Sequence, residues 1–106
     1  MLIYVDIDNT ICYYTNQEDN KNYELALPYK NRIKKVNYLY EKGNTIVYWT
    51  ARGTKTGINW FDITTNQLRE WGCKYHELRM GKPAYDLFID DKNINSEHYF
   101  NNTREH

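Results

Sequence analysis

Residues 2–10 read Leu-Ile-Tyr-Val-Asp-Ile-Asp-Asn-Thr: an apolar run stops abruptly at two acids that one residue separates. A short apolar run of this kind is typical of a strand buried in a parallel sheet. Asp6 and Asp8 would then follow the carboxyl end of that strand. Because open α/β sheets bind their ligands beyond this end, the stretch predicts both the sheet and the place of a binding site on it.

Three further segments have the composition of strands. Residues 45–49, Thr-Ile-Val-Tyr-Trp, are β-branched and aromatic, and they lead directly into the stretch Thr50-Ala-Arg-Gly53. Residues 74–79 suit a third strand. The apolar run Leu87-Phe-Ile89 suits a fourth, which also ends on two acids. Hydroxyl or carboxylate side chains thus follow several of the predicted strands.

Two helical patterns separate these strands. The first begins at Pro28, and Gly43 stands where a helix would end. The second begins near Thr54 or Thr56, either of which could cap it, and Gly72 closes it. Strands that alternate with helices favour a parallel sheet with helices packed on its faces. The 106 residues suffice for one such Rossmann-like α/β domain, spanning residues 1–106, and are too few for two.

The remaining segments lack a clear period. Residues 13–27 are polar and rich in asparagine, which predicts a loop or a hairpin. The tail from Asn93 onward is also polar, and Tyr99 and Phe100 are its expected anchors.

The overall charge argues against one class of function. The chain carries 14 basic and 14 acidic residues, for a formal net charge of zero, whereas a general nucleic-acid coat is normally strongly basic. A local run of cations is typical of the solvated face of a helix: Lys30, Arg32, Lys34 and Lys35. We therefore expect no nucleic-acid partner.

No segment predicts a membrane span or an export signal. No stretch approaches the ~20 apolar residues that cross a bilayer, and the first residues lack the basic region of a signal peptide. Cys12 and Cys73 lack the spacing of metal ligands and are interpreted as reduced thiols. These features predict a cytoplasmic protein without a membrane partner.

Four carboxylates follow two of the predicted strands: Asp6 and Asp8 after the first, Asp90 and Asp91 after the last. If the sheet gathers them at one edge, they repel one another unless a cation or a proton intervenes. Hard oxygen ligands in such a cluster suit Mg²⁺, which takes few protein carboxylates together with waters and phosphate oxygens. The alternative is that these acids are separate caps and turns on the surface.

Thr50 and Lys82 add a chemical context to the acids. A phosphoryl group in transfer carries negative charge on its equatorial oxygens. A hydroxyl, backbone amides and a fixed ammonium can hold these oxygens while a carboxylate attacks in line. Lys82 stands between Gly81 and Pro83, which indicates a defined turn, although alone it could be an ordinary solvated lysine. The full set of acids, threonine and lysine indicates phosphoryl transfer more specifically than any one of these residues does.

In order and type, these residues resemble the four motifs of the haloacid dehalogenase (HAD) superfamily. Asp6-Ile-Asp-Asn-Thr10 is similar to the first motif, Asp-x-Asp-x-Thr, with Asn9 where many members have glycine. Thr50 and Lys82 are similar to the second and third motifs, and Asp90-Asp91 to the fourth. The resemblance covers residues 2–91, most of the chain.

Longer strings resemble one group within this superfamily, the small bacterial capsule-biosynthesis phosphatases. They are Trp-Thr-Ala-Arg-Gly at 49–53, Gln-Leu-Arg-Glu-Trp-Gly at 67–72 and Gly-Lys-Pro-Ala-Tyr-Asp-Leu-Phe-Ile-Asp-Asp-Lys at 81–92. Many HAD proteins carry a cap domain inserted between motifs, but residues 11–44 and 54–81 leave no room for one. The resemblance therefore implies an HAD-like core without a cap.

An open site would follow from the missing cap. Tyr13 and Tyr14, in the loop after the first motif, could flank its entrance or simply pack against their neighbours.

The resemblance also implies a role for each catalytic residue. Asp6 would be the nucleophile that forms an aspartyl-phosphate, and Asp8 would be the acid for the leaving alcohol and then the base for water. Thr50, Ala51 and Lys82 would hold the phosphate together with Asp6.

The implied cofactor is Mg²⁺. Asp6 would bind it through a carboxylate oxygen, Asp8 through its backbone carbonyl and Asp90 through its side chain. Asp91 would act through a water or by orienting another ligand.

These expectations define a magnesium-dependent phosphatase acting on a small phosphorylated substrate. The expected substrate is a sugar or polyol phosphate used in making a capsule or another surface polysaccharide. Because a neighbouring subunit can shape an open site, the sequence is also compatible with a homo-oligomer.

Three alternatives use part of the same residue set. A receiver domain also combines strand-end acids, Mg²⁺, a threonine and a lysine, but its lysine comes last, whereas Lys82 precedes the final acid pair. A phosphatase for polynucleotide ends or other macromolecules would use an open site, although the neutral charge disfavours it. A binding module without activity would not need every catalytic position filled, as it is here.

Overall fold

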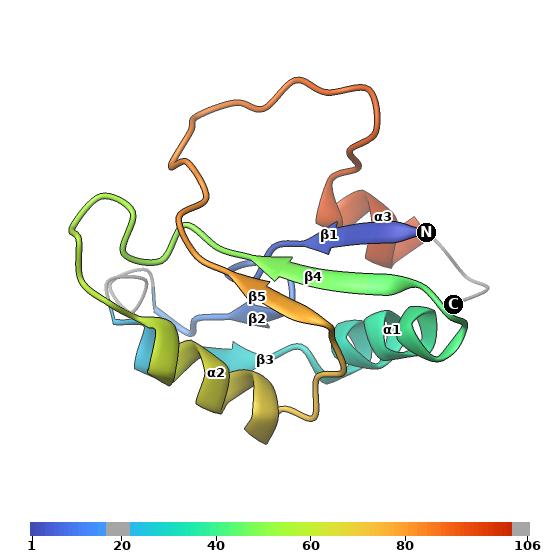
Figure 1. Cartoon of the computed structure of the whole chain (residues 1–106), viewed down its shortest axis with the longest axis horizontal. Helices are drawn as coiled ribbons and strands as arrows, with labels where there is room; N and C mark the ends of the chain where they lie inside the picture. Colours follow the sequence, from blue (N-terminus) through green and yellow to red (C-terminus); the bar gives the residue numbers. More distant parts are fainter. Residues whose placement is uncertain (17–21, 103–106) are drawn as a thin grey trace.

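The computed structural model describes residues 1–16 and 22–102 of the chain. Within these ranges the central element is a sheet of three parallel strands in the order β1-β4-β5 (Figure 1). The strands are β1 (Leu2–Val5), β4 (Thr45–Trp49) and β5 (Glu77–Arg79). Because all three run in the same direction, their carboxyl ends meet at one edge of the sheet.

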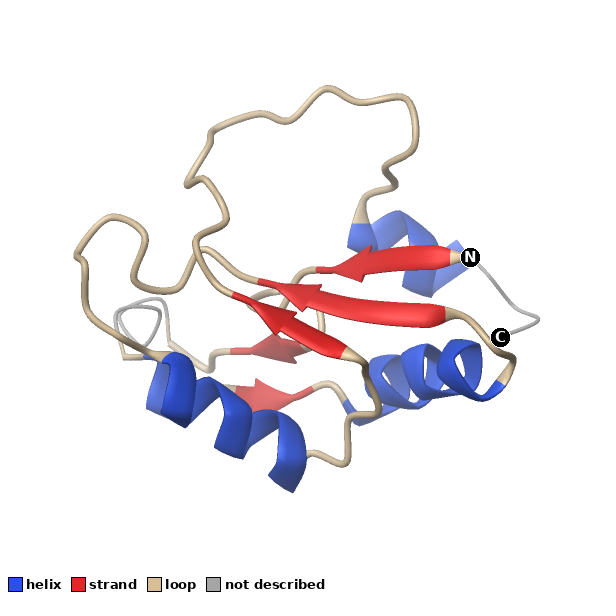
Figure 2. Ribbon diagram, viewed as in Figure 1, coloured by secondary structure: helices blue, strands red, loops and turns tan. Residues whose placement is uncertain are grey.

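In the described part of the chain, three helices flank this sheet: α1 (Lys30–Glu41), α2 (Phe61–Glu70) and α3 (Ser96–Asn102). In Figure 2, α1 and α2 lie along the same side of the sheet, and α3 lies beside β1. No helix within the described ranges is long and apolar enough to cross a bilayer. The predicted α/β class, with a parallel sheet and flanking helices, is confirmed.

A small antiparallel hairpin follows the first strand. It pairs β2 (Cys12–Tyr13) with β3 (Leu27–Pro28), and the short 3-10 helix η2 (Tyr23–Leu25) lies between them. The hairpin is one of the two structures predicted for residues 13–27, of which 17–21 lie outside the described residues.

The core joins the helices to the strands. Ile46 and Tyr48 of β4 and Leu68 of α2 are 0% exposed, and Val36 of α1 is 1% exposed. Phe100 of α3 belongs to the same cluster, as expected of an anchor for the tail. Since burying a side chain of this size contributes about 1.5–3 kcal/mol, these contacts fix the helices on the sheet. Both cysteines are free thiols, as expected.

Two helix boundaries differ from the sequence prediction. Pro28 does not begin α1, because it pairs with Cys12 in the hairpin. Thr54 and Thr56 do not cap α2, which begins only at Phe61. The hydroxyl of Thr56 instead accepts from the amide of Ile58 within the preceding loop, and the hydroxyl of Thr54 donates to the carbonyl of Lys82. The polar tail, for which no helix was expected, forms α3.

The predicted fourth strand is wrong. Leu87, Phe88 and Ile89 are 75%, 49% and 88% exposed, and they belong to the long irregular segment between β5 and α3, orange in Figure 1. An apolar run becomes a strand only when a neighbouring strand pairs with its backbone. The strand pairs of the described chain do not include this run.

Candidate active site

The turn after β1 positions both acids of the first motif. The amides of Thr10 and Ile11 donate to the carbonyl of Ile7 at 3.1 and 2.9 Å, so the chain reverses tightly here. Asn9 has a φ of 60°, in the left-handed region that glycine and asparagine tolerate best. The turn therefore explains why an asparagine can stand at this position.

Arg32 supports this turn from helix α1. Its side chain donates to the carbonyl of Thr10 at 3.1 Å and pairs with Glu97 of α3 at 3.0 Å. Its guanidinium also lies 4.2 Å from the centre of the Tyr29 ring. The prediction of a solvated helix face is therefore wrong for Arg32, which is only 8% exposed.

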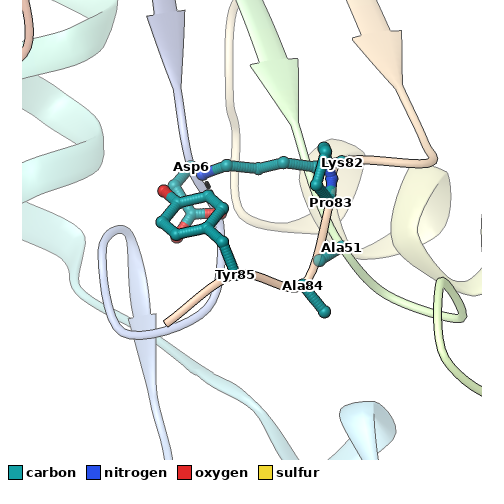
Figure 3. Close-up of a pocket in the computed structure, with 6 residues that line it drawn as sticks. All are labelled: Asp6, Ala51, Lys82, Pro83, Ala84 and Tyr85. Atoms are coloured by element: carbon teal, nitrogen blue, oxygen red, sulfur yellow. Dashed lines mark ion pairs between the residues drawn. The ribbon is translucent and has the colours of Figure 1, made fainter. Parts of the chain in front are cut away.

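An open pocket of about 240 Å³ lies where the three strand ends meet (Figure 3). Asp6 contributes from the end of β1, Ala51 from the loop after β4, and Lys82 from the segment after β5. The ammonium nitrogen Nζ of Lys82 lies 3.6 Å from Oδ1 of Asp6. The structure thus brings together three of the residues predicted to hold a phosphate.

Lys82 is held at its backbone and along its side chain. Its amide donates to the carbonyl of Thr50 at 3.0 Å, and its carbonyl accepts from the hydroxyl of Thr54 at 2.8 Å. Its ammonium lies 5.9 Å from the Trp49 ring centre and 5.4 Å from that of Tyr85. Because aromatic faces attract cations, these rings help to keep the ammonium beside Asp6.

The carboxyl group of Asp6 is destabilised in its ionised form. Burial raises its pKa above the ordinary value, while the charge of Lys82 and the amide of Ile7 act in the opposite direction, and the charge of Asp8 raises the pKa again. The hydroxyl of Thr10 donates weakly to Oδ2 at 3.4 Å. A carboxyl group that lies in an open pocket and has a pKa perturbed by burial is typical of functional sites.

Thr50 does not present a free hydroxyl to the pocket. The residue is 1% exposed, and its hydroxyl oxygen accepts from the amide of Arg52 at 3.2 Å. Its own amide donates to the carbonyl of Arg79. In this arrangement Thr50 therefore shapes the loop whose next residue, Ala51, lines the pocket.

Asp8 is paired with Arg52, a partner that sequence reasoning missed. The guanidinium donates to both carboxylate oxygens of Asp8, from Nε at 3.0 Å and from Nη2 at 2.9 Å. The hydroxyl of Tyr14 donates to Oδ1 of Asp8 at 2.5 Å. Arg52 stands two residues after Thr50 in the sequence, and this closeness to the second motif was the available signal.

Asp90 and Asp91 do not join the pocket. Both are exposed on the irregular segment after β5. Among residues 1–16 and 22–102, no group of three or more His, Cys, Asp or Glu side chains is placed to hold a metal ion. The predicted magnesium ligands Asp6, Asp8 and Asp90 are therefore not assembled here, because the run before Asp90 is not paired with the sheet.

Of the two alternatives for Tyr13 and Tyr14, packing against their neighbours is the one that the structure shows. The Tyr13 ring packs against Tyr29, with ring centres 4.8 Å apart, and the Tyr14 hydroxyl is bonded to Asp8. Tyr85 lines the pocket instead and is 46% exposed. Figure 3 shows its ring beside Asp6.

The fold is similar to that of an MCSG target protein from Vibrio cholerae, known from a crystal structure. The two chains superpose with a TM-score of 0.78 and share 27% sequence identity, over 92% of this chain and 85% of the other. This similarity supports the α/β fold. No protein-family model and no curated protein matches the chain.

Proposed function

We propose that this protein is a magnesium-dependent phosphatase with an HAD-like core, which hydrolyses small phosphate monoesters through an aspartyl-phosphate. The observation that carries the proposal is the pair formed by Asp6 and Lys82, 3.6 Å apart in an open pocket at the carboxyl edge of the sheet. An ammonium in this position can hold phosphoryl oxygens while the neighbouring carboxylate attacks the phosphorus. The resemblance of four motifs to the HAD superfamily supports the same reaction.

The proposed reaction has two steps. First, a carboxylate oxygen of Asp6 bonds to phosphorus, the bond between phosphorus and the ester oxygen breaks, and Asp8, which must enter this step in its protonated form, gives the leaving oxygen a proton. Second, water attacks the phosphorus of the aspartyl-phosphate and gives a proton to Asp8. The bond between phosphorus and Asp6 breaks, which releases inorganic phosphate and restores both side chains.

Bound Mg²⁺ would stabilise negative charge on the phosphoryl oxygens. The arrangement described above does not offer a complete set of ligands for it, because Asp6 lines the pocket and Asp90 does not. The two steps above are therefore derived from the side chains alone. Asp90 would become a ligand if the segment after β5 carried it to the sheet edge.

The magnesium proposal predicts a gain in thermal stability. Mg²⁺ at ~100 times its dissociation constant should add ~2.7 kcal/mol to the free energy of unfolding, measured as a rise in melting temperature. Asp90→Asn should reduce this gain more than Asp91→Asn, the matched change on the adjacent residue. Equal gains in the wild type and Asp90→Asn would exclude Asp90 as a direct ligand. A wild type that does not respond would remove Mg²⁺ from the proposal.

The proposed substrate is a small sugar or polyol phosphate used in surface polysaccharide synthesis in the cytoplasm. The resemblance of the strings at 49–53, 67–72 and 81–92 to capsule-biosynthesis phosphatases supports this substrate. The open pocket surrounds the leaving group with few residues, so little binding energy is available beyond the phosphate itself. Selectivity should therefore be modest, with catalytic efficiencies for small esters spread over about 10²-fold.

Tyr85 is expected to contact the leaving group. Removing its ring with Tyr85→Ala should raise KM for a sugar phosphate by about tenfold, the equivalent of ~1.4 kcal/mol of lost contact, while Tyr85→Phe should retain most of the affinity. Tyr13→Ala is the matched control, because the Tyr13 ring packs on Tyr29 instead. Steady-state kinetics measure the effect, and an unchanged KM in Tyr85→Ala would exclude the contact.

A substrate screen separates the mechanism from the substrate class. Sugar phosphates are expected near the top of such a screen. If they were inert while phosphorylated DNA ends or phosphoproteins turned over efficiently, the substrate class would be wrong and the aspartate mechanism would stand.

A further inference from the structure

Arg52 is a buried cation whose guanidinium donates one hydrogen bond to each carboxylate oxygen of Asp8. The Arg52 side chain has 0% exposure, whereas that of Asp8 has 22%. Two parallel bonds from a planar guanidinium fix the orientation of a carboxylate as well as balancing its charge. A single-point cation such as lysine would leave the carboxylate free to rotate.

The rest of the guanidinium is anchored away from Asp8. Nη1 of Arg52 donates to the hydroxyl oxygen of Thr64 at 3.0 Å and to Oε1 of Gln67 at 2.6 Å, both on helix α2. The Tyr23 ring lies against the guanidinium, 4.8 Å from its carbon. Gln67 in turn donates to the carbonyl of Tyr23 at 2.7 Å. Arg52 therefore connects Asp8 to a rigid frame made of α2 and the segment around Tyr23.

The ion pair between Arg52 and Asp8 is fully buried on the side of the arginine. Apolar residues can often replace a buried ion pair without loss of stability. The specific benefit of the pair is therefore the fixed geometry of Asp8.

We propose that Arg52 is a positioning residue, which holds Asp8 in the orientation needed to exchange a proton with the leaving oxygen and with water. The inference rests on the proposed phosphatase function. Neither Arg52 nor Asp8 is among the residues that line the pocket described above. The Asp8 side chain is 22% exposed and that of Arg52 is 0% exposed, so any effect of Arg52 on the reaction passes through Asp8.

The test compares two substrates that differ in their need for a proton. An alkyl phosphate has a leaving oxygen that must be protonated, whereas a nitrophenyl phosphate releases a stable anion. Arg52→Lys keeps the charge but loses the two parallel hydrogen bonds, so kcat for the alkyl phosphate should fall by about 10²-fold or more, the usual contribution of general acid catalysis. For the nitrophenyl phosphate the loss should stay below about tenfold, and KM should change little for either ester.

A double variant checks that the effect passes through Asp8. Residues that act as one unit are not additive, so Asp8→Asn with Arg52→Lys should be about as slow as Asp8→Asn alone. Arg69→Lys is the matched control, because Arg69 is an exposed arginine of α2 that bonds Asn66. It should leave the rates for both substrates unchanged.

Thr64→Val keeps the inference testable if Arg52→Lys fails to fold. It removes one anchor of the guanidinium without touching Asp8, and should cause a smaller loss with the same preference for the alkyl phosphate. Equal losses for both substrates, or independent losses in the double variant, would overturn the inference and leave the phosphatase standing. A wild type that hydrolyses neither ester would overturn the proposed function, and the inference with it.

Discussion

Replacing Asp6 by alanine is expected to abolish phosphate release, with a loss in kcat of at least ~10³-fold, because uncatalysed hydrolysis of phosphate monoesters leaves almost no background. Asp6 contributes the carboxylate that lines the pocket beside Lys82. Without it, the aspartyl-phosphate of the proposed reaction could not form. The measurement is release of inorganic phosphate from an aryl phosphate in the presence of Mg²⁺. Asp86→Asn, a change to an exposed acid without an assigned role, should retain full activity.

Asp6→Asn distinguishes lost chemistry from lost folding. Because the pKa of Asp6 is raised by burial, the folded protein favours the protonated carboxyl. That contribution to stability is present below the ordinary pKa and is lost as the pH rises through the raised pKa. Asparagine is neutral at every pH, so the inactive variant should melt no lower than the wild type at neutral pH without metal. Retained activity, in a preparation free of other phosphatases, would remove Asp6 from its role.

Gly53→Ala should destabilise the protein more than any other glycine replacement considered. Gly53 has a φ of 82°, and a Cβ atom there would lie 2.1 Å from the carbonyl oxygen of Ile58 and 3.2 Å from the Trp60 ring. The backbone of the loop must move to relieve this clash. We expect a loss of about 3 kcal/mol from strain and overpacking, or a fall of ~12 °C or more in melting temperature.

Gly72→Ala is the matched control for this clash. Gly72 has a φ of 73°, but no atom lies within 4 Å of the added Cβ. Its replacement costs only the left-handed backbone conformation, roughly 1–2 kcal/mol. If thermal denaturation showed equal losses for both variants, the contact with Ile58 would not be the cause. Gly53→Ala should also lower activity, because the displaced loop contains Ala51 and Arg52.

The sheet and the place of the pocket could be predicted from the sequence because both follow from strand direction. Apolar runs fixed β1 and β4, and parallel strands end at a common edge. The approach of Lys82 to Asp6 follows from that geometry. The contact between Asp8 and Arg52 was not predicted, because beyond the closeness of Arg52 to the second motif it depends on where two side chains point across separate loops.

The run at 87–89 shows the limit of composition. An apolar segment of this length is compatible with a strand, but pairing also requires a partner strand within reach, which the pattern does not contain. The position of Asp90 and Asp91 was predicted from that strand. Because the strand does not form, the predicted position was wrong as well. The place of Tyr85 at the pocket was missed because it depends on the path of the irregular segment after β5, which the residue pattern does not contain.

The all-parallel sheet also constrains the order in which the molecule assembles. β1 pairs Leu2 with Thr45, so the first strand pair cannot form as a local hairpin and must wait for the chain between them to close. Contacts of high sequence separation slow folding. The pocket takes residues from beyond the end of each of the three strands, four of them from beyond β5, so no nascent or truncated chain that lacks the third strand could form it.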